Sequence, residues 1–232
     1  MQRLTSHDRK KCELWRDSLT PTQRKKLRPG KAIGRGEFAC AFTVEGDDTR
    51  VVKLTSDRDD AASFSVLGRK NLTVIPKVYG VHRLARPKST FSTIYLDNFA
   101  IEVERVKPVP ETGVEAASIN LLSKALWGYG EGNLPKRIDD QTRASLDRKC
   151  ARMKTASGKK AMDACRKVVA EAISVYETLK AAKYDFEDAS ARNWGRNSEG
   201  RLVALDLGWS TTAPKNVKVP ALAGMLKPKV LR

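Results

Sequence analysis

Three polar residues late in the chain have the types and the spacing for phosphate chemistry with a bound divalent cation. Asp188 and Asn193 stand five positions apart in a stretch typical of a loop, after a long helical pattern. Asp206 follows the short apolar run 202–205 and precedes Gly208, so we expect it at the end of a strand. Carboxylate and amide oxygens are ligands that hard cations such as Mg²⁺ prefer, commonly together with substrate phosphates. These residue types therefore indicate metal-assisted phosphate chemistry.

Lys53 and a pair of glycines, early in the chain, could bind the phosphates themselves. Lys53 lies among the apolar residues 51–54, which predict an inner strand. A lysine that projects from a buried surface needs an anionic partner, and a phosphate would provide one. Gly34 and Gly36 begin the run Gly34-Arg35-Gly36-Glu37-Phe38-Ala39. Two positions without side chains let backbone N–H groups approach a polyphosphate closely.

The order and spacing of these motifs resemble those of the protein-kinase superfamily over about residues 31–210. Asp206-Leu207-Gly208 lies 13 residues beyond Asn193, a separation typical of that family. In particular, the chain looks like the abbreviated kinases of bacteriophages and of bacterial effectors or toxins. The matching residues are Gly34, Gly36 and Phe38 of the glycine-rich loop, Lys53 of the strand lysine, Asp188 and Asn193 of the catalytic loop, and Asp206.

The resemblance implies ATP as cofactor, with Mg²⁺ or Mn²⁺, and assigns roles to named residues. Asp188 and Lys53 would be catalytic, with Asp188 orienting or accepting the hydroxyl proton, and Asn193 and Asp206 would hold the metal ion. The adenine pocket would be lined by Ile33, Ala41, Val51 and Val103, and the hinge would follow in residues 104–106. The ATP-binding set would be Gly34, Gly36, Phe38, Ala41, Val51, Lys53, Asp60, Val103, Glu104 and Val106.

The family pairs its strand lysine with a helix glutamate, and this chain has no glutamate between Lys53 and Glu102. Asp60 precedes the apolar residues Phe64 and Leu67 with the helical spacing that the family's glutamate shows. We therefore expect Asp60 to be the partner of the lysine, with Asp57 and Asp59 as alternatives. Other departures are Ala39 at the third loop glycine and Phe186-Glu187 where ordinary kinases have His-Arg.

Local patterns predict the elements that must position these residues. The fold class expected is α+β, a two-lobed kinase-like fold with an antiparallel-sheet lobe and a truncated helical lobe. The expected domains are a basic helical extension (1–30), a sheet lobe (31–106) and a helical lobe (107–232). Residues 32–44 and 50–54 predict one hairpin. Further strands are expected at 78–84, 99–106 and 202–205, helices at 8–28, 57–67, 115–126, 143–155 and 161–182, and a loop or short strand at 85–98.

The formal net charge of +17 is concentrated outside these motifs. Residues 1–31 carry ten Lys and Arg against three acids, residues 136–167 carry eleven against four, and residues 209–232 carry five against none. Such segments could bind a nucleic acid directly or attract an acidic protein. The alternative is that they are solvated helix faces, because no nucleic-acid motif accompanies the charge.

Neither a membrane segment nor a zinc site is expected. No run of about 18 apolar residues is present, and the polar N-terminus lacks the apolar stretch of a signal peptide. The four cysteines form no CxxC pair, and only two histidines accompany them. We expect reduced thiols in a cytoplasmic protein, in the host cytoplasm if the chain comes from a phage or an effector.

Three functions remain open at this point. The leading interpretation is an ATP-dependent serine/threonine protein kinase with an acidic or nucleic-acid-associated protein substrate, although Arg192 also matches the D-x-A-A-R-N loop of tyrosine kinases. A small-molecule kinase of the aminoglycoside or choline type is the second, and the basic segment 136–167 argues against a cationic substrate. The third is a pseudokinase, a binding module that keeps the fold, which Ala39, the missing glutamate and the missing His-Arg favour.

Overall fold

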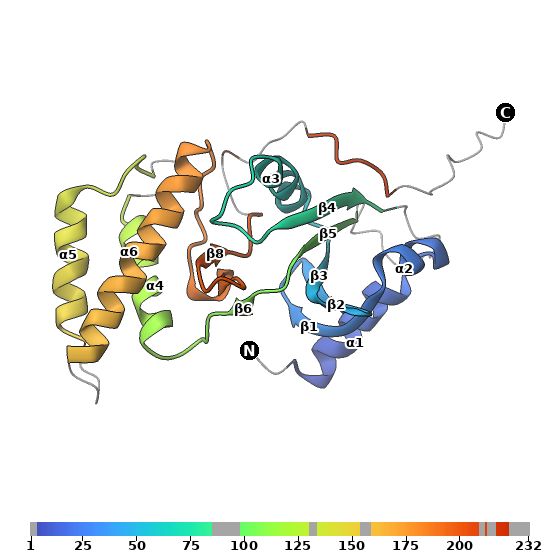
Figure 1. The fold of residues 1–232 in the computed structure, drawn as a ribbon, viewed down its shortest axis with the longest axis horizontal. Coiled ribbons are helices and arrows are strands. Elements are labelled where there is room, and N and C mark those ends of the chain that lie inside the picture. The colour runs from blue at the N-terminus through green and yellow to red at the C-terminus, as the bar shows by residue number, and fades with distance from the viewer. Residues whose placement is uncertain are drawn as a thin grey trace. The chain divides into compact units, whose positions relative to one another are not determined.

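A computed structural model of the chain describes residues 4–84, 98–129, 134–153, 159–208, 212 and 217–222 (Figure 1). The chain divides into two compact units. One, called the sheet unit, contains the described residues of 4–71, 77–105 and 217–222. The other, called the helical unit, contains the described residues of 72–76 and 106–212.

The sheet unit is built on a five-stranded antiparallel sheet in the order β1-β2-β3-β5-β4. Strand β5 therefore inserts between β3 and β4, next to the strand that carries Lys53. The elements are α1 (Ser6–Asp17), α2 (Pro21–Leu27), β1 (Pro29–Arg35), β2 (Ala39–Val44), β3 (Asp47–Thr55), α3 (Arg58–Arg69), β4 (Val78–Arg83) and β5 (Phe99–Glu104).

The two faces of this sheet are occupied differently. Phe42, Val52 and Leu54 point into a core that includes Leu27 at the end of α2 and Cys12 of α1. Across the strands, Lys53 stands opposite residue 41 of β2 and residue 101 of β5. Because side chains alternate along a strand, Lys53 projects from the face that α1 and α2 do not cover.

Helix starts in this unit follow the capping residues of the sequence. Thr5 and Thr20 each form a capping box with the residue three positions later, and Pro21 takes the first helical position of α2. Asp57 caps α3 by accepting hydrogen bonds from the N–H groups of residues 59 and 60. The caps fix where α3 begins, and therefore which of its side chains face the sheet.

Helix α3 approaches the sheet closely at a glycine. A Cβ atom added to Gly68 would lie 2.8 Å from both Cβ and Cγ2 of Val78, the first residue of β4. Such a distance is shorter than carbon atoms tolerate, so only glycine lets the last turn of α3 lie this close to β4.

The helical unit packs its helices against one another and carries a small three-stranded antiparallel sheet in the order β6-β7-β8. Helices α4, α5 and α6 lie side by side in Figure 1, and a disulfide joins Cys150 of α5 to Cys165 of α6. The elements are β6 (Lys107–Pro108), α4 (Val114–Trp127), α5 (Asp140–Ala151), α6 (Lys159–Ala181), the 3-10 turn η1 (Ala191–Asn193), β7 (Trp194–Arg196) and β8 (Leu202–Ala204).

The expected α+β class, with an antiparallel sheet followed by helices, is confirmed. One strand prediction is wrong: residues 32–44 form not one strand but the end of β1, a turn and β2, because the backbone reverses between Gly36 and Ala39. Strands β6 and β7 were not predicted, since two or three residues are too short for a periodic pattern. Most of the predicted segment 85–98 and most of the basic segment 209–232 lie outside the described residues.

The expectation of reduced thiols is also wrong. Cys12 is bonded to Cys40 and Cys150 to Cys165, with a Cα–Cα distance of 5.6 Å in both pairs. That separation lies in the normal range for a disulfide. Among the residues that the structure describes, no helix is long and apolar enough to cross a membrane.

The contact at Gly68 gives a stability prediction. Alanine is the better helix former by about 1 kcal/mol, so Gly68→Ala would stabilise an uncrowded helix. Because the added methyl group meets Val78, we expect Gly68→Ala to lower the free energy of unfolding by about 1–3 kcal/mol instead. Urea denaturation measures the change. In a Val78→Gly background the same substitution should no longer be destabilising, and a stabilising effect in the wild-type background would contradict the contact.

Candidate functional site

Lys53 and Asp60 form a buried ion pair in the sheet unit. The Nζ atom of Lys53 lies 2.8 Å from Oδ2 of Asp60, and the two side chains are 16% and 1% exposed. The ring of Phe64, one helical turn after Asp60, lies with its centroid 5.9 Å from the same Nζ atom. A carboxylate this deeply buried is stable only when it is paired, so Asp60 fixes the position of the ammonium group.

The cap of α3 explains why Asp60 is the partner among three neighbouring aspartates. Oδ1 of Asp57 accepts the N–H groups of Asp59 and Asp60, so Asp57 serves as the helix cap. Asp60 then lies on the buried side of the first turn. The expected pairing of Lys53 with Asp60, rather than with Asp57 or Asp59, is the one that the structure contains.

The glycine-rich hairpin, residues 34–40, connects β1 to β2. The N–H of Gly36 donates to the carbonyl of Ala39 at 2.8 Å and closes the turn. The carbonyl of Phe38 accepts the hydroxyl of Thr55 at 3.1 Å and the N–H of Ser56 at 3.0 Å, which ties the tip to the end of β3. Phe38 itself is 44% exposed.

The fold does not require glycine at the two matching positions of this hairpin. A Cβ at Gly34 would meet only Cβ of Ala41, at 3.7 Å, and a Cβ at Gly36 only the carbonyl oxygen of Ala39, at 4.0 Å. Neither residue has a positive φ. A side chain would therefore fit at both positions, so packing within the fold does not account for the two glycines.

Three of the predicted adenine-pocket residues share the face of Lys53. Ala41 stands directly opposite Lys53 on the neighbouring strand. Val51 lies two positions from Lys53 on β3, and it stands opposite Val103 on β5, so all three side chains project from the same face of the sheet as Lys53. Val51 and Val103 are buried, and Ile33 is half-buried. The sheet therefore presents an apolar surface beside the lysine.

The predicted hinge, Glu104 to Val106, is less open to a purine than expected. The N–H of Glu104 donates to the carbonyl of Lys77 at 2.8 Å, and the N–H of Arg105 donates to the carbonyl of Thr49 at 2.7 Å. Both amides are thus used within the sheet unit and cannot also donate to a purine ring. Val106 is half-buried and belongs to the helical unit.

In the helical unit, Asp188 opens a loop whose polar groups converge on it. Its Oδ1 atom accepts the hydroxyl of Ser190 at 2.7 Å, and its Oδ2 atom accepts a guanidinium N–H of Arg192 at 3.0 Å. The side-chain amide of Asn193 donates to the carbonyl of Asp188 at 2.9 Å. The loop therefore folds back on the aspartate.

These contacts determine the charge state of Asp188. Partial burial acts to raise the pKa of the carboxyl group, but the hydrogen bonds from Ser190, Arg192 and Asn193 outweigh it and hold the pKa below its ordinary value of 3.8. Asp188 is therefore ionised at neutral pH and is a weak base that can accept a hydrogen bond.

Asn193 and Asp206 lie at the same end of the β7–β8 pair. Trp194 opposes Ala204 in that ladder, and the N–H of Leu205 donates to the carbonyl of Asn193 at 2.8 Å. Since Nδ2 of Asn193 donates to Asp188, its Oδ1 oxygen is the atom left to coordinate a cation. Oδ1 of Asp206 accepts the N–H of Gly208 at 3.2 Å, which holds this carboxylate in a turn.

This donor set fits a metal ion that also binds phosphate. The side chains of Asn193 and Asp206 carry hard oxygen atoms, and no group of three or more His, Cys, Asp or Glu side chains suited to a metal exists within the described ranges. Mg²⁺ is often held by one or two carboxylates together with substrate phosphates rather than by a complete protein cage.

Several residues that support this loop were not predicted. The indole of Trp194 donates to the carbonyl of Ala189 at 3.0 Å, and its ring packs edge-on against Phe186 with centroids 5.2 Å apart. The carbonyl oxygen of the Asn120 side chain, on α4, accepts the N–H of Ala191 at 3.1 Å. The hydroxyl of Tyr184 donates to the carbonyl of Leu207. Trp194 was visible as an apolar residue beside Asn193, whereas nothing in the sequence singles out Asn120.

No family model and no curated protein matches the chain. Solved structures do match it, at low identity. The GDP and kanamycin complex of APH(2")-IIia matches with 14% identity and a TM-score of 0.40, over 86% of this chain and 74% of that chain. The aminoglycoside phosphotransferase from Alicyclobacillus acidocaldarius matches with 15% identity and a TM-score of 0.33, over 81% and 64%. The choline kinase LicA from Streptococcus pneumoniae matches with 11% identity and a TM-score of 0.34, over 88% and 70%.

These likenesses are distant, and nothing about the chemistry of this chain is inferred from them. All carry names of small-molecule phosphotransferases or of complexes with a small molecule, and the protein kinases expected from the sequence are not among these three.

The ion pair between Lys53 and Asp60 gives a second prediction. Asp60→Asn removes the buried carboxylate charge that faces the ammonium group of Lys53, so we expect a loss of about 3 kcal/mol in the free energy of unfolding. The double variant Lys53→Met/Asp60→Leu removes both charges and should recover most of that loss, since apolar replacements of buried pairs are often neutral. Denaturant titration of both variants measures this. Equal stability of Asp60→Asn and wild type would mean that the pair is not buried as described.

Proposed function

We propose that the protein is an ATP- and Mg²⁺-dependent phosphotransferase. The observation that carries the proposal is the buried Lys53–Asp60 pair, because it fixes a cationic group on an apolar sheet face in the unit that holds the glycine-rich hairpin. A lysine held in this way is suited to bind phosphate oxygens. The missing side chains at Gly34 and Gly36, which packing does not require, support the same assignment.

The residues of the helical unit supply the remaining functions. Asn193 and Asp206 would hold Mg²⁺, which neutralises phosphate charge when it is bound. In the transfer, the acceptor oxygen forms a bond to the γ-phosphorus, the bond from that phosphorus to the β–γ bridging oxygen breaks, and ADP leaves. Asp188, ionised and only weakly basic, would orient the acceptor hydroxyl by accepting its hydrogen bond and would take its proton late in the reaction.

The acceptor is proposed to be a hydroxyl compound without positive charge. The exposed side chains of α5 and α6 include Arg148, Lys149, Lys160 and Lys167, which would repel a cation such as an aminoglycoside or choline. A serine/threonine protein substrate, the leading interpretation of the sequence, stays a prediction. The cytoplasmic location and the acidic or nucleic-acid-associated partners stay predictions.

A binding module without transfer is the second candidate, and one observation favours it. Ser190 and Arg192 both bond to the carboxylate of Asp188, so the group that would orient the acceptor is already engaged. Because the side chain of Arg192 is 73% exposed, an acceptor hydroxyl could displace it at little cost.

The proposal predicts separate effects of the two aspartates. Asp206→Asn should abolish ADP formation from ATP, because an amide holds a hard dication poorly. Asp188→Asn should slow it by about 10²–10⁴ while leaving nucleotide affinity near that of wild type. The assay compares the rates of ADP formation with anionic sugars, neutral hydroxyl compounds and an acidic protein as acceptors.

Asp163→Asn serves as the control, since Asp163 is an exposed carboxylate on α6 that should not affect the rate. Wild-type rates in both Asp188→Asn and Asp206→Asn would contradict the proposal. Nucleotide binding without ADP formation under every acceptor would establish the binding module instead.

A further inference from the structure

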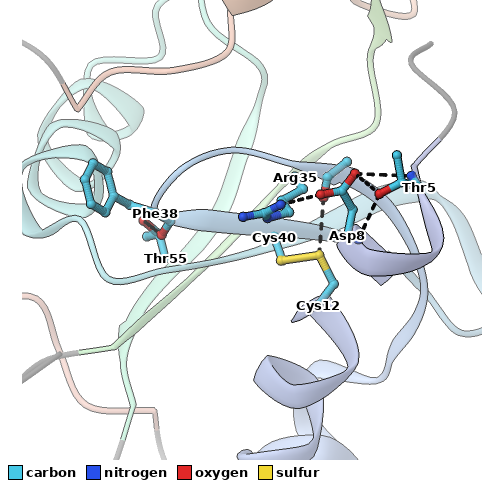
Figure 2. The surroundings of a disulfide bond; sticks show 8 residues. Thr5, Asp8, Cys12, Arg35, Phe38, Cys40 and Thr55 are labelled. Atoms are coloured by element: carbon cyan, nitrogen blue, oxygen red, sulfur yellow. Dashed lines mark hydrogen bonds and ion pairs between the residues drawn. A yellow bond between two sulfur atoms is a disulfide. The ribbon is translucent and has the colours of Figure 1, made fainter. Parts of the chain in front are cut away.

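Helix α1 is joined covalently to the glycine-rich hairpin. The disulfide between Cys12 and Cys40 connects the middle of α1 to the second residue of β2 (Figure 2). The Sγ atom of Cys12 also lies 3.9 Å from the carbonyl oxygen of Gly34, the first of the two hairpin glycines. The helix is therefore packed directly behind the strand ends that carry the turn.

An ion pair joins the same helix to the opposite strand. Asp8, on the first turn of α1, pairs with the guanidinium of Arg35, the last residue of β1 (Figure 2). The hydroxyl of Thr5 and then the guanidinium of Arg35 lower the pKa of Asp8 from its ordinary value of 3.8 to about 2. Asp8 stays ionised well into the acidic range, so this contact persists at neutral pH.

The two attachments hold both members of one strand pair. Arg35 and Cys40 stand directly opposite each other in the β1–β2 ladder, immediately before the turn that Gly36 and Ala39 close. The tip is held again at Phe38, whose carbonyl accepts hydrogen bonds from the end of β3. A short hairpin with two glycines would otherwise lose much conformational freedom when it closes on a ligand.

We propose that α1 is a brace that positions the glycine-rich hairpin, through Cys12–Cys40 and Asp8–Arg35, in the conformation that binds nucleotide phosphates. This inference rests on the proposed function. Preorganisation improves affinity by lowering the entropy lost on binding, so cutting the brace should weaken ATP binding roughly three- to tenfold. The KM for ATP should rise while kcat changes little, because the residues of the brace are not among those to which acceptor and metal binding are assigned.

Substitution is a cleaner way to cut the brace than reduction. Cys12 and Cys40 are 0% and 3% exposed, so a thiol reagent reaches them only after α1 has separated from the sheet. Cys12→Ala/Cys40→Ala removes the bond without leaving a free thiol. The matched control is Cys150→Ala/Cys165→Ala, which removes a disulfide from the other unit. Asp8→Asn weakens the second attachment at a partly exposed position, and we expect it to keep the fold because its amide oxygen can still accept the capping-box hydrogen bond of Thr5.

The experiment measures the Kd and KM for ATP together with hydrogen exchange of the amides of residues 36–40. We expect faster exchange at the hairpin and a roughly three- to tenfold weaker Kd in Cys12→Ala/Cys40→Ala. Asp8→Asn should give a smaller change in the same direction, and the control pair should change neither quantity.

Three results would overturn the brace. One is unchanged hairpin exchange and unchanged ATP affinity in Cys12→Ala/Cys40→Ala. Another is an equal loss of affinity in both disulfide variants, which would indicate general destabilisation. The third is faster exchange at the hairpin in Cys12→Ala/Cys40→Ala together with no binding of ATP by the wild-type protein. In that case the proposed function is wrong, and so is the role of the brace in phosphate binding.

Discussion

The buried ion pair between Lys53 and Asp60 is the interaction on which the sheet unit depends. A carboxylate that is 1% exposed must have a cation beside it, so α3 can dock only where its first turn meets Lys53 on β3. At the other end of α3, Gly68 allows close contact with β4. Contacts at both ends of α3 thus fix how the helix packs on the sheet. The lysine is held on the sheet face that α1 and α2 leave uncovered.

The helical unit positions its polar residues by hydrogen bonds rather than by a buried ion pair. The loop that begins at Asp188 is closed by Asn193, anchored to the core by Trp194 and held on α4 by Asn120. Backbone pairing between Asn193 and Leu205 then places Asp206 at the same ladder end. A buried ion pair therefore positions Lys53, whereas hydrogen bonds position the helical-unit residues to which phosphate chemistry is assigned.

Much of this arrangement was predictable because it depends on local pattern. The long helix α6 and the loop after it follow from apolar spacing, and Asp60 follows from its place one turn before Phe64. Contacts between distant residues were not predictable in the same way. The 28-residue separation of Cys12 and Cys40 carries no signal until α1 is packed behind β2, and the engaged amides of Glu104 and Arg105 depend on tertiary partners. The roles assigned to the site residues stay predictions.

The central claim, that the chain binds a nucleotide together with a divalent metal ion, is tested most directly by paramagnetic broadening of backbone amide NMR signals. Mn²⁺ would be added alone and with a non-hydrolysable ATP analogue. We expect broadening of residues 34–40, 188–193 and 206–208 only when both are present, with Asp206→Asn removing the effect. Broadening confined to exposed carboxylates such as Glu13, with these three segments unaffected, would contradict the claim.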